Sequence, residues 1–179
     1  PMYTRGASGV LPNGKFKGKM IMLESLWDRE AFPWQADWYR TKVIENLGDK
    51  ANDSFRLWYT DRALHGDLSE QEDPTRTVSY VGTLQQALLD LSAWVEKGIS
   101  PPNSTNYQIV DGQVIVPASA EEREGIQPTV VLKANGSKKV IARTGEKVNY
   151  SAEIKVPAST GKVVSVEWDL DGDGTFESQ

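Results

Sequence analysis

The stretch Lys19-Met-Ile-Met-Leu-Glu-Ser-Leu-Trp-Asp28-Arg-Glu-Ala-Phe-Pro33-Trp34 decides the fold that we expect for this chain. Its apolar run, Met20 to Leu23, has the uninterrupted hydrophobicity of a strand buried on both faces in a parallel sheet. A short loop with Asp28 follows, and Pro33 then stands where the first turn of a helix tolerates a missing N–H group. The stretch therefore predicts a strand, an acidic loop and a helix that Gly48 terminates.

A second stretch repeats the order of strand and loop, with a histidine in place of the acid. It reads Ser54-Phe-Arg-Leu-Trp-Tyr-Thr-Asp-Arg-Ala-Leu-His65-Gly-Asp67. Its apolar part, Phe55 to Tyr59, predicts the next strand, because aromatic and apolar residues favour a buried strand. His65, in the loop that follows, is the single histidine of the chain.

The clearest helical pattern runs from Thr83 to Lys97. Thr83 and Gln86 have the spacing of a capping box, and Gly98 is a typical end for a helix. The apolar stripe that we expect to be buried consists of Leu84, Ala87, Leu88, Leu91, Trp94 and Val95. The alternation of strand, helix, strand and helix indicates an α/β arrangement with parallel strands.

The pattern changes after residue 102. A short hairpin is expected over residues 107–116 around Asp111-Gly112, and from Pro128 onward only strand patterns occur, over residues 129–134, 147–156 and 162–170. We therefore expect an α/β part over residues 1–117, a linker over 118–127, and an incomplete all-β part with an immunoglobulin-like sandwich over 128–179.

Asp28 and His65 are the candidate catalytic residues. Each follows a predicted strand, and the loops after parallel strands gather at one edge of a sheet. A histidine titrates near neutral pH and suits a general base, while a carboxylate holds it in one tautomer. An acid after one strand and a histidine after the next complete a triad in the chain order Ser, Asp, His. We expect Asp28 to be the acid and His65 the base.

Alternatives remain open at both positions. A lone histidine is often a capping or surface residue without chemistry. The other carboxylates near the two loops are Glu24, Glu30, Asp61 and Asp67, and Asp67 fits a local Asx turn. Asp28 is preferred because it follows the strand directly and precedes the helix.

The nucleophile and the substrate pocket have weaker signals. Gly6-Ala7-Ser8-Gly9-Val10 departs from Gly-x-Ser-x-Gly at its last position, and Ser8 lacks the preceding strand and following helix of a nucleophile elbow. A flexible loop is therefore the preferred interpretation of residues 1–18. Trp27 and Phe32 lie in the Asp28 loop and are candidates to line a pocket for an apolar or aromatic acyl group.

Residues 17–102 resemble the C-terminal segment of α/β-hydrolases of the tannase and feruloyl-esterase type. The resemblance rests on four features: the Leu26-Trp27-Asp28 turn, the helix that opens Pro33-Trp-Gln-Ala-Asp-Trp-Tyr39, the Leu64-His65-Gly66 loop, and the helix end Leu91-Ser-Ala-Trp-Val-Glu-Lys-Gly98 before Pro101-Pro102. It implies Asp28 as the triad acid, His65 as the base, and an ester or amide as substrate. The family's serine elbow and oxyanion-hole segment lie upstream in such enzymes and are not found here.

The C-terminal stretch Val163-Val-Ser-Val-Glu-Trp168-Asp-Leu-Asp-Gly-Asp-Gly-Thr-Phe-Glu177 resembles the middle of a PKD-type domain, a sandwich that is common on exported bacterial hydrolases. That resemblance implies a buried Trp168 and strands beyond this chain. Asp169, Asp171 and Asp173 match the first half of a calcium-binding EF-hand loop, whose twelfth position would be 180. Calcium is therefore a possible ligand, and a turn held by Asx hydrogen bonds is the simpler interpretation.

Composition restricts the remaining classes of function. The chain has 179 residues, a net charge of −5 and no cysteine, which excludes disulfides and thiolate catalysis and gives no sign of a nucleic-acid-binding surface. No apolar run approaches the roughly 18 residues that span a bilayer.

Two hypotheses follow from the sequence. The first is the C-terminal part of a secreted, periplasmic or cell-surface bacterial serine esterase, inactive alone, whose nucleophile lies upstream of Pro1. The second is a non-catalytic cell-surface binding or structural protein. A strand, Gly-x-Ser-x-Gly and a helix upstream of Pro1 would favour the enzyme.

Overall fold

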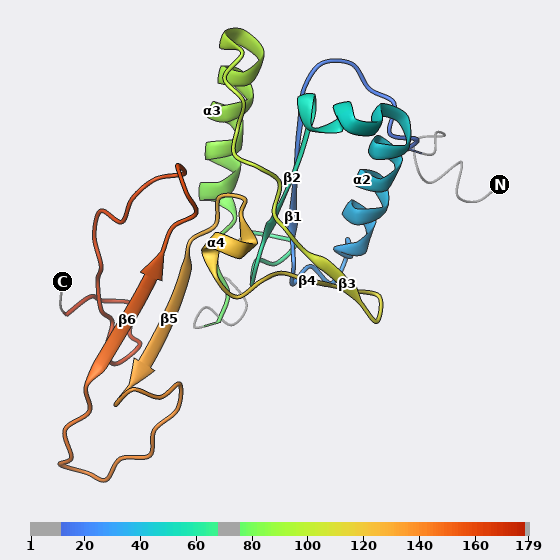
Figure 1. Cartoon of the computed structure of the whole chain (residues 1–179). Coiled ribbons are helices and arrows are strands. Elements are labelled where there is room, and N and C mark those ends of the chain that lie inside the picture. The colour runs from blue at the N-terminus through green and yellow to red at the C-terminus, as the bar shows by residue number, and fades with distance from the viewer. Residues whose placement is uncertain (1–11, 68–75, 178–179) are drawn as a thin grey trace.

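The computed structural model describes residues 12–67 and 76–177. Two parallel strands lie between two long helices, and a separate antiparallel hairpin forms the C-terminal part (Figure 1). The α/β arrangement expected from the first two sequence stretches is confirmed, whereas a sandwich is not formed among the described residues. Ser8 and the rest of residues 1–11 lie outside the described part of the chain.

The central pair of strands is β1, Met20–Ser25, and β2, Phe55–Thr60. They are parallel, in register from Met20 opposite Phe55 to Ser25 opposite Thr60. Every residue of β2 is buried, and those of β1 are half-buried. The strand predictions are confirmed, and both chain segments leave the sheet at the same edge.

Helix α2, Trp34–Leu47, and the 3₁₀ helix η1, Gly48–Asp53, connect the strands. The helix packs on one face of the sheet through Ala36, Tyr39, Val43 and Leu47, whose spacing places them on one side of a helix. Trp34 and Trp38 fall on the other side and stay exposed. The core beneath α2 contains Phe55, Leu57 and Tyr59 of β2.

Helix α3, Val81–Lys97, lies on the opposite side of the strands (Figure 1). It begins at Val81, two residues before Thr83, and the Val81 N–H donates a hydrogen bond to the Ser79 hydroxyl at 3.1 Å. The predicted capping box is therefore wrong, and Gln86 donates to Asp90 instead.

The predicted burial of the α3 stripe is also wrong for three of its six members, and Leu91 is half-buried. Ala87 and Trp94 are buried, and the Trp94 ring lies under the Arg56 guanidinium, 5.0 Å from the ring centroid. Leu84, Leu88 and Val95 are exposed. The helix thus keeps an apolar face without a packing partner among the described residues.

Two short elements follow on the chain. The hairpin of β3, Gln108–Val110, and β4, Gln113–Ile115, turns at Asp111 and Gly112, both with positive φ, as the sequence predicted. Helix α4, Ala120–Arg123, lies within the predicted linker and begins with the Ser119 hydroxyl accepting from Glu122 N–H. Within this segment Ala120 and Arg123 are buried.

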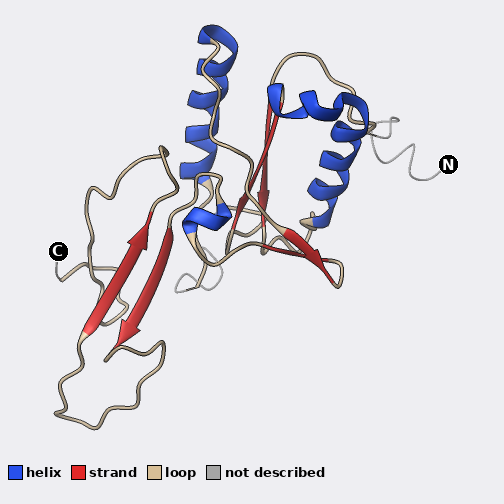
Figure 2. Cartoon of the chain, in the orientation of Figure 1, coloured by secondary structure: helices blue, strands red, loops and turns tan. Residues whose placement is uncertain are grey.

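The C-terminal part consists of β5, Thr129–Ala134, and β6, Tyr150–Lys155, paired antiparallel (Figure 2). The third strand, predicted over residues 162–170, is wrong, since this segment makes no ladder with β5 or β6. Alternation favours a strand only where a partner satisfies its backbone. Trp168 is half-buried against Tyr150, with ring centroids 6.5 Å apart, while Val130 and Leu132 of β5 stay exposed.

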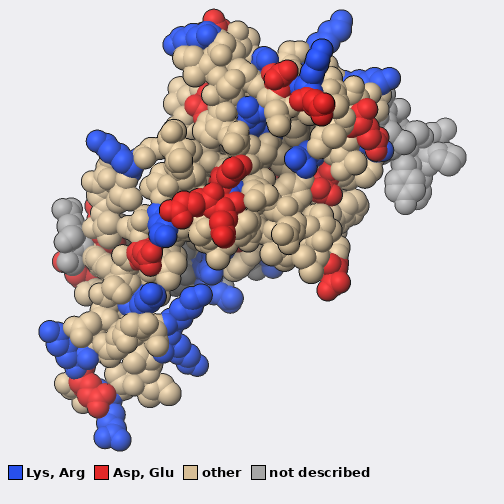
Figure 3. Space-filling model, viewed as in Figure 1, with Lys and Arg blue, Asp and Glu red and all other residues tan. Residues whose placement is uncertain are grey.

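The visible surface carries charges of both signs (Figure 3). Acidic side chains gather over α4, which contributes Glu121 and Glu122, and basic side chains gather around the β5–β6 hairpin (Figure 3). In the described ranges, none of the helices is both long and apolar enough to cross a membrane.

Candidate active site

The loops after β1 and β2 are joined by backbone hydrogen bonds that extend the sheet toward the site. Leu26 N–H donates to Thr60 O, and Trp27 N–H donates to Ala63 O, both at 3.0 Å. Asp28 N–H then turns back to Ser25 O, at 3.1 Å. These bonds place Asp28 directly beside the loop that carries His65.

Both oxygens of the Asp28 carboxylate have hydrogen-bond partners. Its Oδ1 accepts hydrogen bonds from the backbone N–H groups of Glu30, at 2.7 Å, and Ala31, at 2.8 Å. Its Oδ2 lies 2.8 Å from Nδ1 of His65. Burial of Asp28, whose side chain is 7% exposed, raises its pKa, but the Glu30, Ala31 and His65 hydrogen bonds outweigh burial, so the pKa of Asp28 is lowered. The carboxylate is therefore ionised at neutral pH.

His65 is oriented by that carboxylate. An ionised carboxylate only accepts hydrogen bonds, so Nδ1 of His65 carries the proton and Nε2 is left as the basic nitrogen. The hydrogen bond with Asp28, its charge, and the charge of Glu30 raise the pKa of His65 above its ordinary value. The imidazole is 51% exposed, and Nε2 lies 3.9 Å from Glu30 Oε2. The predicted proximity of Asp28 and His65 is thus confirmed.

Two of the four rival carboxylates have other partners. Asp61 forms an ion pair with Arg123, and Asp67 accepts a hydrogen bond from the Ser79 hydroxyl. Glu24 lies on β1 opposite Tyr59, and burial, together with the nearby Asp28 charge, raises the pKa of Glu24 to about 7. Sequence reasoning weighed Glu24 only as an alternative to Asp28, and its perturbed ionisation has no signal in the sequence.

The two aromatic residues predicted to bind substrate lie in different places. Phe32 lines a cavity of about 300 Å³ together with Asp28 and, from the β3–β4 hairpin, Val114. The Trp27 ring does not line this cavity. Two guanidinium groups lie over the ring instead, those of Arg62 and Arg76, at 5.5 Å and 5.8 Å from its centroid.

The acidic turn after Trp168 brings its carboxylates together. The cluster consists of Asp169, Asp171, Asp173 and Glu177, which each offer an oxygen within 4.8 Å of the others. The sequence prediction missed Glu177, because the EF-hand spacing directs attention to position 180. The same oxygens also accept turn N–H groups, for example Gly172 N–H to Asp169 Oδ1 at 2.6 Å. The cluster has the oxygen ligands of a hard cation site and the bonds of an Asx-stabilised turn.

Sequence comparisons give no independent assignment. Neither the protein-family models nor the curated proteins nor the solved structures include a match to this chain. A functional conclusion therefore rests on the geometry of Asp28 and His65.

Proposed function

We propose that this chain is the C-terminal part of a serine esterase or related acyl hydrolase with an α/β-hydrolase sheet, and that it supplies the triad acid and base. The observation that carries the proposal is the 2.8 Å contact between Asp28 Oδ2 and His65 Nδ1 at the end of two parallel strands. Its chain order and strand positions are those of a triad that needs only a serine. The resemblance of residues 17–102 to tannase-type and feruloyl-esterase-type hydrolases supports the same assignment.

The pair would act as general base and then general acid. A serine hydroxyl donates its proton to Nε2 of His65 while its oxygen attacks the ester carbonyl, and a tetrahedral intermediate forms. Its collapse breaks the ester bond, and the imidazolium returns the proton to the leaving alcohol. Water then releases the acyl group by the same two steps. Asp28 stays ionised throughout and stabilises the imidazolium.

The nucleophile would come from a hydrolase segment outside this chain, packed against β1 and α3. Two features support that placement. The far edge of β2 is covered, since Thr105 N–H donates to Leu57 O at 2.9 Å, whereas the described residues pair β1 with β2 alone. The exposed Leu84, Leu88 and Val95 of α3, which lies against β1, would cover the next strands.

The finer parts of the proposal concern substrate and setting. Phe32, beside Asp28, would contact an apolar or aromatic acyl group, and Trp27 would shape the loop from its outer side. The apolar face of β5 and β6, with Val130 and Leu132 exposed, would be completed by further PKD-type strands. A PKD-type unit would place the enzyme in the periplasm, outside the cell or on its surface.

Calcium would occupy the turn formed by Asp169, Asp171, Asp173 and Glu177. Three aspartates and a glutamate in one turn repel one another, and a divalent cation relieves that repulsion with the oxygen ligands it prefers. Extracellular modules bind calcium at about millimolar concentration.

Hydrolysis of 4-nitrophenyl acetate tests the proposed function. In the longer protein that the proposal implies, His65→Ala should lower kcat by about 10⁶-fold and Asp28→Asn by about 10⁴-fold, because the base takes part in every proton transfer whereas the acid orients and stabilises it. Glu45→Gln, at an exposed position on α2, should leave the rate unchanged. The chain alone should give no turnover that depends on His65 or Ser8.

Two outcomes would contradict the proposal. Turnover in the longer protein that survives His65→Ala would remove the histidine from the reaction. Turnover in the chain alone that disappears in Ser8→Ala would place the nucleophile within residues 1–11.

A further inference from the structure

The loop that carries His65 is held from outside the sheet by the segment between the two halves of the chain. The side-chain amide of Gln127 makes two hydrogen bonds with the backbone of Asp61, as a neighbouring strand would. Asp61 N–H donates to Gln127 Oε1, at 2.8 Å, and Gln127 Nε2 donates to Asp61 O, at 3.0 Å. Both backbone groups of Asp61 are therefore satisfied by one side chain that is distant in sequence.

Arg123 fixes that side chain in place. Its guanidinium is 8% exposed and lies 3.4 Å from Asp61 Oδ2 and 3.3 Å from Gln127 Oε1. Its Nε donates to Pro117 O, at 2.8 Å, and its own carbonyl accepts from Asn106 N–H, at 2.7 Å. An arginine with this many partners has one orientation, so the contacts with Asp61 and Gln127 are set by the fold of the segment.

Because of the position of Asp61 in the chain, these contacts influence where His65 lies. Asp61 follows Thr60, the last residue of β2, and precedes Arg62, whose φ of 64° is in the left-handed region. Ala63, next along the chain, is fully buried and accepts the hydrogen bond from Trp27 N–H. His65 lies two residues further on, with Nδ1 against Asp28. The path of this turn therefore decides where the imidazole lies.

We propose that Arg123 and Gln127 are positioning residues that hold the 61–65 loop so that His65 meets Asp28. We call Asp61, Arg123 and Gln127 the loop clamp. A role of the loop clamp in catalysis rests on the proposed hydrolase function, whereas its effect on the position of His65 does not depend on that function. A half-exposed imidazole on a loop needs such support, because a displacement of about 1 Å breaks a catalytic contact.

The single histidine makes the proposal measurable without substrate. The pKa of His65, followed by NMR of its one imidazole, reports how well the Asp28 contact is populated. In Gln127→Ala, the Asp61 amide should exchange with solvent at least tenfold faster, and the His65 pKa should fall toward its ordinary value of 6.5. Glu121→Ala, at an exposed position on α4, the helix that contains Arg123, should change neither.

Three outcomes would overturn the proposal. A folded Gln127→Ala protein whose His65 pKa is unchanged would show that the clamp does not position the imidazole. If Gln127→Ala unfolds, Arg123→Lys is the second variant, because it keeps the charge but loses the Nε hydrogen bond to Pro117 O. An unchanged His65 pKa in Arg123→Lys would overturn the proposal in the same way. In the unaltered chain, an Asp61 amide that exchanges at the rate of an open loop would show that the clamp is not formed in solution. Failure of the esterase assay, with these results intact, would count against the proposed function alone.

Discussion

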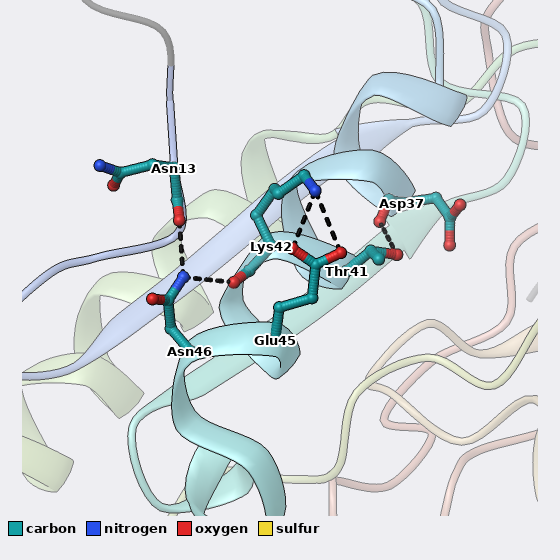
Figure 4. Close-up of polar contacts among 6 residues, drawn as sticks. All are labelled: Asn13, Asp37, Thr41, Lys42, Glu45 and Asn46. Carbon is teal, nitrogen blue, oxygen red and sulfur yellow. Dashed lines mark hydrogen bonds and ion pairs between the residues drawn. The ribbon is translucent and has the colours of Figure 1, made fainter.

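Gly14 is the position where one added methyl group should cost the most stability. Its φ is +74°, and a Cβ there would lie 2.3 Å from the carbonyl carbon of Lys42 in the backbone of α2. The segment is also tied to the helix, since the Asn46 side-chain amide donates to Asn13 O at 2.7 Å and to Lys42 O at 2.8 Å (Figure 4). Neither the helix backbone nor the segment can move without losing these contacts.

The cost of Gly14→Ala has two parts. A left-handed backbone costs an L-residue about 1–2 kcal/mol, and overpacking against a fixed neighbour costs about 1–3 kcal/mol more. The free energy of unfolding should therefore fall by about 2–5 kcal/mol, a large fraction of the roughly 5–15 kcal/mol that stabilises a typical domain. Gly18→Ala is the matched control, because Gly18 has a φ of +85° and open space where the Cβ would lie. It should show only the backbone part, about 1–2 kcal/mol.

Urea unfolding followed by tryptophan fluorescence measures both variants, with the fully buried Trp58 as a reporter. The effect of alanine on the unfolded chain is common to both positions and cancels in the comparison. Equal losses at Gly14 and Gly18, within about 0.5 kcal/mol, would refute the reasoning that the 13–16 segment docks on α2.

Three further predictions follow from other parts of the chain. Burial gives Glu24 a folded-state pKa of about 7, above its ordinary value of 4.5, so folding takes up a proton between these pH values and the stability of the fold should decrease as pH rises through that window. In melting curves recorded across this pH range, Glu24→Gln should remove the decrease, whereas Glu167→Gln, at an exposed position, should not. Trp94→Ala should cost about 3–5 kcal/mol in urea unfolding, whereas Leu88→Ala, at a site that is 60% exposed, should stay within about 0.5 kcal/mol; similar losses would show that the apolar face of α3 is buried in this chain. Millimolar calcium should raise the melting temperature of the chain, and Asp171→Ala should abolish the effect. An unchanged melting temperature during the titration would show that the turn is held by its hydrogen bonds to backbone N–H groups and not by calcium.

Elements with strong local signals were predictable from sequence. The apolar run from Met20 and the Asp111-Gly112 turn each specify their own backbone, and both appear where expected. The Asp28–His65 contact also followed from local reasoning, because two parallel strands bring their following loops to one edge.

Features that depend on distant partners were not predictable. Thr83 has the residue type of a cap, but the helix begins two residues earlier, at Val81, with Tyr80 as its N-cap and no side-chain cap. Leu84, Leu88 and Val95 on α3 lack a packing partner among the described residues, and residues 162–170 lack a ladder partner there, so neither pattern is realised in full. The Gln127–Asp61 hydrogen bonds join residues that are 66 positions apart, and no sequence pattern around either residue predicts them.

The pKa of His65 tests the central claim most directly. NMR titration of the one imidazole in the chain should give a pKa above 6.5, since the ionised Asp28 holds the Nδ1 proton. Asp28→Asn should bring that pKa down to its ordinary value or below, because the neutral amide loses the charge that favours the imidazolium. Glu30→Gln should lower it less, as Glu30 Oε2 lies 3.9 Å from Nε2 and contributes only its charge. A His65 pKa at or below 6.5 in the unaltered chain, or one that Asp28→Asn does not change, would contradict a carboxylate-held catalytic histidine.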